Sequence, residues 1–157
     1  MERVSIDEVV NETNPMGVHS VRRPISAALG FTDFAMNYFE LKPGESVSGG
    51  YHTHHDQEEV FYVEDGTAQF DTEDGAVTVD SGEVIRFAPG KFQQEYNPED
   101  ADEQVVGFAF GSPGAQHEWV QIESLVHCRI CEATSSRLRM GAFELTCTDC
   151  ENSFVLG

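Results

Sequence analysis

Short stretches rich in β-branched and aromatic residues alternate with glycine- and proline-containing turns from Phe31 onward. These stretches predict strands over residues 35–42, 59–63, 67–72, 76–80, 84–88, 92–97 and 104–110. Turn signals separate most of them, at Pro43-Gly44, Asp65-Gly66, Asp74-Gly75, Ser81-Gly82 and Pro89-Gly90. No long helical pattern interrupts the series. The spacing therefore indicates an all-β fold, either a sandwich or a barrel.

The segment before Phe31 contains one predicted helix and one paired basic site. Ser5-Ile-Asp-Glu8 fits a capping box, which predicts a short helix over residues 6–12. Arg22 and Arg23 are adjacent, and two interpretations of the pair are open. They hold a substrate anion, or they form structural ion pairs with nearby carboxylates.

Acidic residues dominate the composition and limit the classes of partner. The 157 residues suit one domain, or one domain with a small appendage. Asp and Glu number 28 against 9 Lys and Arg, for a net charge of −19. Such a chain repels phosphates, so we expect no nucleic-acid partner. The charge is typical of a halophile, in whose salt-rich cytoplasm ions screen the repulsion. An acidic surface that recruits a basic partner is the alternative.

Two further patterns bear on localisation. No run of 18 apolar residues is present, so we expect no membrane span. The N-terminal sequence Met-Glu-Arg-Val-Ser-Ile-Asp lacks the basic segment and apolar core of a signal peptide. We therefore expect a cytoplasmic protein.

Candidate metal ligands lie where one predicted strand ends and the next begins. His52 and His54 are two residues apart, so an extended strand places both imidazoles on one face. The polar residues 55–58 indicate a turn, after which Glu59 opens the next strand. Folding that strand back brings Glu59 towards the imidazoles. Two histidines and a carboxylate leave open positions on a divalent metal. A polar strand end with surface histidines is the alternative.

The chain resembles the cupins at two motifs. His52-Thr-His54, then Glu59 and Gly66, is similar to the first cupin motif, and residues 82–97 are similar to the second. In the second motif Pro89 falls one residue late, and Gln93 stands where the family has its third histidine ligand. The resemblance covers roughly residues 40–97. It implies a cupin double-stranded β-helix, or jelly-roll barrel, with a divalent metal (Fe, Mn, Zn or Ni) held inside by the matching residues.

Gln93 and Glu95 determine what such a site can do. An amide oxygen binds divalent metals more weakly than imidazole does. Gln93 is therefore a weak fourth ligand, or a hydrogen-bond partner of metal-bound water, or the mark of a pocket that binds something other than a metal. Glu95 lies two residues further along the same strand face and is the candidate general base. If it points inward it needs a metal, an arginine or a raised pKa, and if the register differs it faces solvent.

All four cysteines lie in the last 30 residues, as Cys128-Arg-Ile-Cys131 and Cys147-Thr-Asp-Cys150. This spacing matches a four-cysteine zinc site. So short a segment buries too little to fold alone, so a bound Zn²⁺ would contribute much of its stability. Two disulfides, free thiols or an iron site with the same ligands are the alternatives. The segment resembles a zinc ribbon, and we expect a barrel over residues 1–122 and a ribbon over residues 123–157.

Two functions remain open at this stage. Cupins include dioxygenases, decarboxylases, sugar isomerases and epimerases, as well as non-catalytic binding modules, so the fold alone does not choose a reaction. The first function is a metal-dependent enzyme, an oxygenase, isomerase or decarboxylase, acting on a small oxygen-rich molecule. The second is a ligand-binding or sensor module whose ribbon contacts a protein partner. In both cases we expect a small-molecule ligand, and a homodimer is one option.

Overall fold

Antiparallel strands make up most of the computed structural model, which describes residues 1–12, 14, 17–116, 118–126, 128, 130–131, 137–141 and 144–155. In chain order the strands are β1 (Val21–Pro24), β2 (Ala35–Leu41), β3 (His52–His54), β4 (Glu58–Asp65), β5 (Thr67–Thr72), β6 (Gly75–Asp80), β7 (Val84–Phe87), β8 (Gln93–Tyr96), β9 (Val105–Ser112), β10 (Ile122–Leu125), β11 (Arg137–Gly141), β12 (Glu144–Cys147) and β13 (Ser153–Val155). Three short helices, η1 (Ile6–Glu8), α1 (Ile25–Leu29) and η2 (Trp119–Gln121), complete the described elements.

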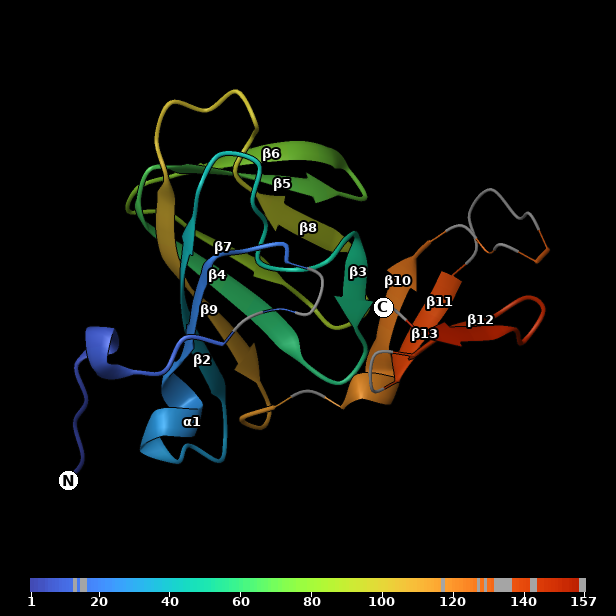
Figure 1. Cartoon of the computed structure of the whole chain (residues 1–157), viewed down its shortest axis with the longest axis horizontal. Helices are drawn as coiled ribbons and strands as arrows, with labels where there is room; N and C mark the ends of the chain where they lie inside the picture. The colour runs from blue at the N-terminus through green and yellow to red at the C-terminus, as the bar shows by residue number, and fades with distance from the viewer. Residues whose placement is uncertain are drawn as a thin grey trace.

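The strands form two sheets, which close into a barrel in Figure 1. Within the described residues the first sheet has the order β1-β2-β9-β4-β7, and the second has the order β13-β12-β11-β10-β3-β8-β5-β6. Every strand predicted from residues 35–110 is present, with ends that differ by one or two residues. The all-β jelly-roll prediction is therefore confirmed. No helix among the described residues is long and apolar enough to cross a membrane.

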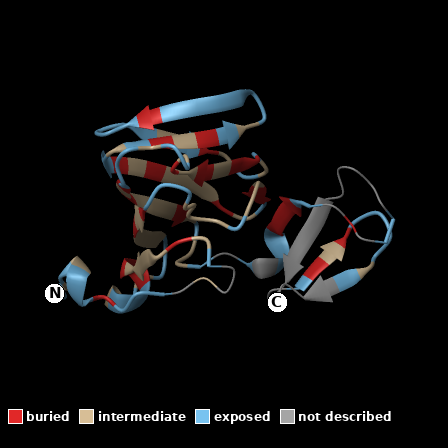
Figure 2. Ribbon diagram, turned by 45° about the horizontal axis from the view of Figure 1, so that its top comes forward, coloured by how far each residue is buried: buried red, intermediate tan, exposed pale blue. Residues whose placement is uncertain are grey.

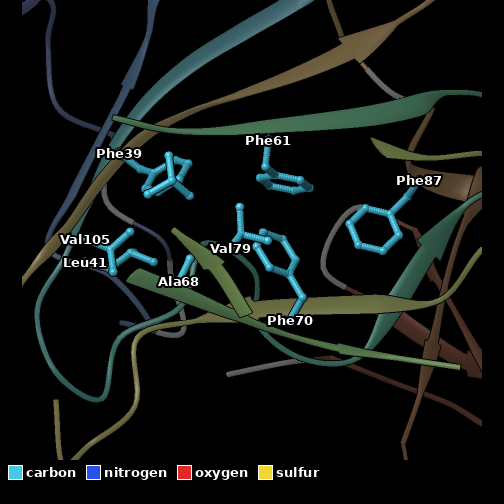
Figure 3. Close-up of a cluster of buried hydrophobic side chains, with 9 residues drawn as sticks. Phe39, Leu41, Phe61, Ala68, Phe70, Val79, Phe87 and Val105 are labelled. Carbon is cyan, nitrogen blue, oxygen red and sulfur yellow. The ribbon is translucent and has the colours of Figure 1, made fainter. Parts of the chain in front are cut away.

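Buried apolar side chains from both sheets form a cluster between them (Figure 3). Phe61, Phe70 and Phe87 pack together with ring centroids 5.3 to 6.2 Å apart, in edge-on and tilted arrangements that aromatic quadrupoles favour. Phe61 and Val63 alternate with outward-facing residues along β4, as period-2 burial requires. The whole cluster is Phe39, Leu41, Phe61, Val63, Ala68, Phe70, Val79, Phe87 and Val105.

The N-terminal segment differs from the prediction. Only Ile6–Glu8 forms a helical turn, and Ser5 makes no capping hydrogen bond, so the helix expected over residues 6–12 is wrong beyond that turn. The arginine pair holds the segment instead. Arg23 donates to the carbonyl oxygen of Val9 over 2.6 Å, and Arg22 forms an ion pair with Glu12 at 2.8 Å. The arginine pair therefore makes structural contacts.

The second sheet continues beyond the barrel into the C-terminal strands. β10 pairs with β3 of the barrel on one side and with β11 on the other. The expected domain boundary at residues 122/123 thus falls within β10, a strand that both parts share. At the opposite edge of this sheet β6 is largely exposed (Figure 2), with Val79 as its buried residue.

Candidate functional site

Two strands from different sheets bring His52, His54 and Glu59 together. His52 and His54 lie on β3, and both are buried. Glu59 lies near the start of β4, in the other sheet. One ligand atom from each residue lies within 4.8 Å of the others, and His54 Nε2 is 3.2 Å from Glu59 Oε1. The convergence that the sequence predicted is present, and this group can hold a metal ion.

The hydrogen bonding of His52 and the pKa of His54 suit metal binding. His52 Nδ1 lies 2.9 Å from the carbonyl oxygen of Gly50. A carbonyl only accepts, so Nδ1 is the donor, and in a neutral imidazole of this tautomer the lone pair lies on Nε2. Burial, and then the proximity of His52, lower the pKa of His54 to about 3. His54 is therefore neutral near pH 7, which is the form that binds metals.

Gln93 is fully buried on β8, where it pairs with His52 on β3. Its Nε2 donates to Glu59 Oε2 over 2.8 Å. With the amide turned the other way, Gln93 Oε1 would face Glu59 Oε2 and the two oxygens would repel each other. The orientation with Nε2 towards Glu59 is therefore the correct one. Gln93 Oε1 is buried and has no hydrogen-bond partner among the described residues. Native structures rarely leave such an atom unsatisfied, and a cation held by the neighbouring imidazoles and carboxylate would satisfy it. The donor set fits a divalent transition metal.

Glu95 points into the barrel. Its side chain is 1% exposed, and its strand partner on β5 is the core residue Phe70. Burial, and then the charge of Glu59, raise the pKa of Glu95 to about 8, although Ser48 offsets part of the shift. The carboxyl group therefore keeps its proton at neutral pH. The solvent-facing alternative for Glu95 is wrong.

One polar contact near the site could not be expected from local sequence. His55 follows the two candidate ligands but turns to the other side of β3, where its Nε2 lies 2.6 Å from Glu123 Oε2. Glu123 is a buried residue of β10, 68 positions away in the chain. No short-range pattern marks this pair, because β10 meets β3 only in the folded sheet.

The four cysteine sulfurs form a second cluster, in which all lie within 4.8 Å of one another. Cys128 and Cys150 sulfurs are 3.6 Å apart, and those of Cys131 and Cys147 are 3.8 Å apart. Four thiolates around a tetrahedral Zn²⁺ are about 3.8 Å apart, whereas a disulfide bond measures about 2.0 Å. Backbone N–H groups of Cys131 and Ile130 lower the pKa of Cys128 to about 6, which favours its thiolate. The cluster can hold a metal ion, as its spacing predicted.

Comparisons with known proteins agree with this architecture. Residues 37–106 match the family described as the Cupin domain. A search among curated proteins gave no match. Among solved structures, a cupin protein from Bacteroides fragilis has a TM-score of 0.55 at 18% identity, covering 73% of this chain and 84% of its own.

Two similar structures carry more specific descriptions. A sugar phosphate isomerase of the cupin superfamily from Silicibacter pomeroyi has a TM-score of 0.62 at 16% identity, covering 98% of this chain and 90% of its own. The polyketide cyclase RemF from Streptomyces resistomycificus has a TM-score of 0.61 at 22% identity; the match covers 74% of this chain and 81% of the cyclase. At these identities the likeness shows the fold, and in the first case it extends over the C-terminal strands.

Proposed function

Because this chain is a cupin superfamily protein, with its cupin domain at residues 37–106, we propose that the barrel binds one divalent metal ion through His52, His54 and Glu59. The observation that supports the proposal most directly is the meeting of these ligand atoms within 4.8 Å. Gln93 completes the set in two ways. Its Nε2 orients the carboxylate of Glu59, and its buried Oε1 is a weak fourth ligand.

The ligand of this site is a small, oxygen-rich molecule. A divalent metal bound there would supply Lewis acidity towards a ligand oxygen. The sugar phosphate isomerase and the polyketide cyclase are named for substrates with many oxygen atoms, which supports the same class here. An uncharged ligand suits this chain better than a phosphorylated one. The net charge is −19, and Arg86 and Lys91 already pair with Glu58 and Glu73.

Glu95 is the residue that moves a proton in an enzymatic version of this function. Its carboxyl group is enclosed in the barrel, two residues along the strand from Gln93. A neutral carboxyl donates a proton first and then accepts one, so a single residue serves both directions of an isomerisation. The second candidate is a non-catalytic binding module, which the weak ligand Gln93 favours. Ligand-dependent stabilisation without turnover would identify that module.

The four cysteines bind Zn²⁺ in a structural site. Four thiolates fill a tetrahedral zinc and leave no position open for a substrate. The Zn²⁺ therefore stabilises the C-terminal strands by linking the segments that carry the cysteines. It takes no part in chemistry within the barrel.

Metal analysis of the purified full chain tests both centres. We expect two metal ions per chain, and His52→Ala/His54→Ala should lose one of them while zinc remains. Glu59→Gln and Glu58→Gln form a matched pair, because the two carboxylates are adjacent on β4 but Glu58 pairs with Arg86. Only Glu59→Gln should lose the barrel metal. One metal per chain, insensitive to the histidine replacement, would rule out the barrel site.

A further inference from the structure

β3, the strand that carries His52 and His54, has only three residues and pairs mainly with β10. All three of its residues have partners on β10. Towards the rest of the barrel the strand register has one pair, His52 with Gln93, supplemented by the hydrogen bond from Gly90 N to His54 O at 2.8 Å. In Figure 1 β3 lies where the barrel meets the C-terminal strands. The position of two candidate ligands therefore depends on β10.

Contacts at both ends of β3 extend this pairing. His55 donates its backbone N–H to Gln121 O, and Leu125 donates its N–H to Tyr51 O, each over 3.0 Å. On the face of β3 away from the ligands, the side chains of His55 and Glu123 meet at 2.6 Å. Glu123 lies opposite Thr53 in the strand register, so this contact adds a side-chain link between β3 and β10 that a shift of register would break.

The cysteine cluster in turn holds β10. Cys128 follows Leu125, the last residue of β10, by three positions, and Cys147 is the last residue of β12. Sulfurs from the two Cys-x-x-Cys pairs lie 3.6 and 3.8 Å apart across the cluster. A metal ion bound by these sulfurs ties the segment after β10 to the end of β12. The sheet β10-β11-β12 then presents a fixed edge to β3.

We propose that β10 positions the barrel metal site, so that filling the four-cysteine centre raises the metal affinity of His52, His54 and Glu59. Glu123 is the positioning residue, acting through His55 and the register of β3. Without a fixed β10, only a fraction of molecules holds both imidazoles in place, and the apparent affinity falls by that fraction. Linkage makes the effect reciprocal, because the barrel metal then also favours the zinc-bound state. The inference rests on the proposed metal site in the barrel.

The test measures Mn²⁺ binding to the full chain by electron paramagnetic resonance, because Mn²⁺ prefers nitrogen and oxygen ligands and leaves the thiolates to Zn²⁺. Removing zinc with an organomercurial should weaken Mn²⁺ binding by about 10-fold or more, within the usual range of site-to-site coupling. Glu123→Gln should weaken Mn²⁺ binding in the zinc-loaded protein and reduce the further loss on zinc removal. Glu58→Gln, which removes the same charge from β4, should leave both values within about two-fold of wild type.

Amide hydrogen exchange shows whether zinc removal loosens only the β3–β10 pairing or the whole barrel. On zinc removal the amides of His55 and Leu125 should lose protection, while those of β4 and β9 keep theirs. Loss throughout β4 and β9 would overturn the proposal, since the C-terminal strands would then hold the whole barrel. Unchanged Mn²⁺ affinity after zinc removal and in Glu123→Gln would also overturn it, with the barrel site intact. If wild type binds no Mn²⁺ and no other divalent metal, the proposed function itself fails, and this inference with it.

Discussion

Gln93 and Glu59, 34 residues apart in the chain, meet through one hydrogen bond of 2.8 Å between Nε2 and Oε2. Gln93 belongs to β8 and Glu59 to β4, so this bond joins the two sheets inside the barrel. It gives a physical role to a glutamine that replaces a histidine of the cupin motif. The amide donates a hydrogen bond to the carboxylate through its nitrogen and offers a lone pair through its oxygen. A neutral imidazole does the same two things with its two ring nitrogens.

Replacing Gln93 tests this dual role. Gln93→Leu removes the donor that orients Glu59, and we expect barrel metal binding to weaken by about 10- to 100-fold, the usual effect of losing an orienting partner. Gln93→His supplies a nitrogen ligand and should bind metal more tightly. Isothermal titration calorimetry with Mn²⁺ measures both. Gln94→Leu is the matched control, because the neighbouring side chain faces the other side of β8. Equal affinities for the two leucine variants would contradict the assignment.

Gly66 should be the least replaceable turn glycine of the barrel. Its φ is +80°, and a Cβ there would collide with the carbonyl oxygen of Gln104. Gly82 has a similar φ of +87° but no atom within 4 Å of an added Cβ. Left-handed backbone alone costs about 1–2 kcal/mol for a residue with a Cβ. We therefore expect Gly82→Ala to lose about that much unfolding free energy, and Gly66→Ala clearly more.

Denaturant unfolding of the two alanine variants, under one set of metal conditions, gives both values. Equal losses would show that the Gln104 carbonyl moves away at little cost. The comparison isolates the collision, because both variants share the backbone strain.

His19 should make the protein sensitive to mild acid. Burial, and then the charge of Arg22, lower the pKa of His19 below its ordinary value of 6.5. Between the lowered pKa and 6.5, the unfolded chain binds a proton that the folded chain does not. The contribution of His19 to stability is thus complete above pH 6.5 and is lost as the pH drops below it, whereas the raised pKa of Glu95 acts in the opposite direction over this range. Denaturant midpoints between pH 7.5 and about 5 measure this slope.

Glutamine does not titrate, so His19→Gln should reduce the loss of unfolding free energy as the pH falls below 6.5. His54 and Glu95 titrate in both proteins, so the contribution of His19 is the difference between the slopes of wild type and variant. A slope identical to wild type would mean that His19 titrates normally in the folded protein.

Local pattern was enough for much of the fold and the site. Strands of period 2 between glycine turns are encoded within five to eight residues, and they predicted β2 and β4 to β9 closely. His52, His54 and Glu59 are close in sequence, so one turn between two strands suffices to bring them together. The two Cys-x-x-Cys pairs are likewise local, and their sulfurs meet as the spacing predicted.

The elements that local pattern missed depend on distant partners. η1 is shorter than expected because the chain turns extended at Val9. There the Val9 carbonyl oxygen accepts a hydrogen bond from Arg23, 14 residues away in the chain. α1 has five residues, which is too short a segment to show a helical period. β10 was not recognised as a barrel strand, because its register is set by β3, some 70 residues earlier.

The amino-acid sequence by itself determined the strand pattern, the jelly-roll class and the residue types at both candidate metal clusters. Tertiary structure alone decided that Glu95 faces inward, that Gln93 contacts Glu59, and that β10 joins the cysteine cluster to the histidine strand. The physical reason is the range of the interactions. Backbone preference and side-chain periodicity act over a few residues, whereas sheet register and burial arise from pairings between segments far apart in the chain.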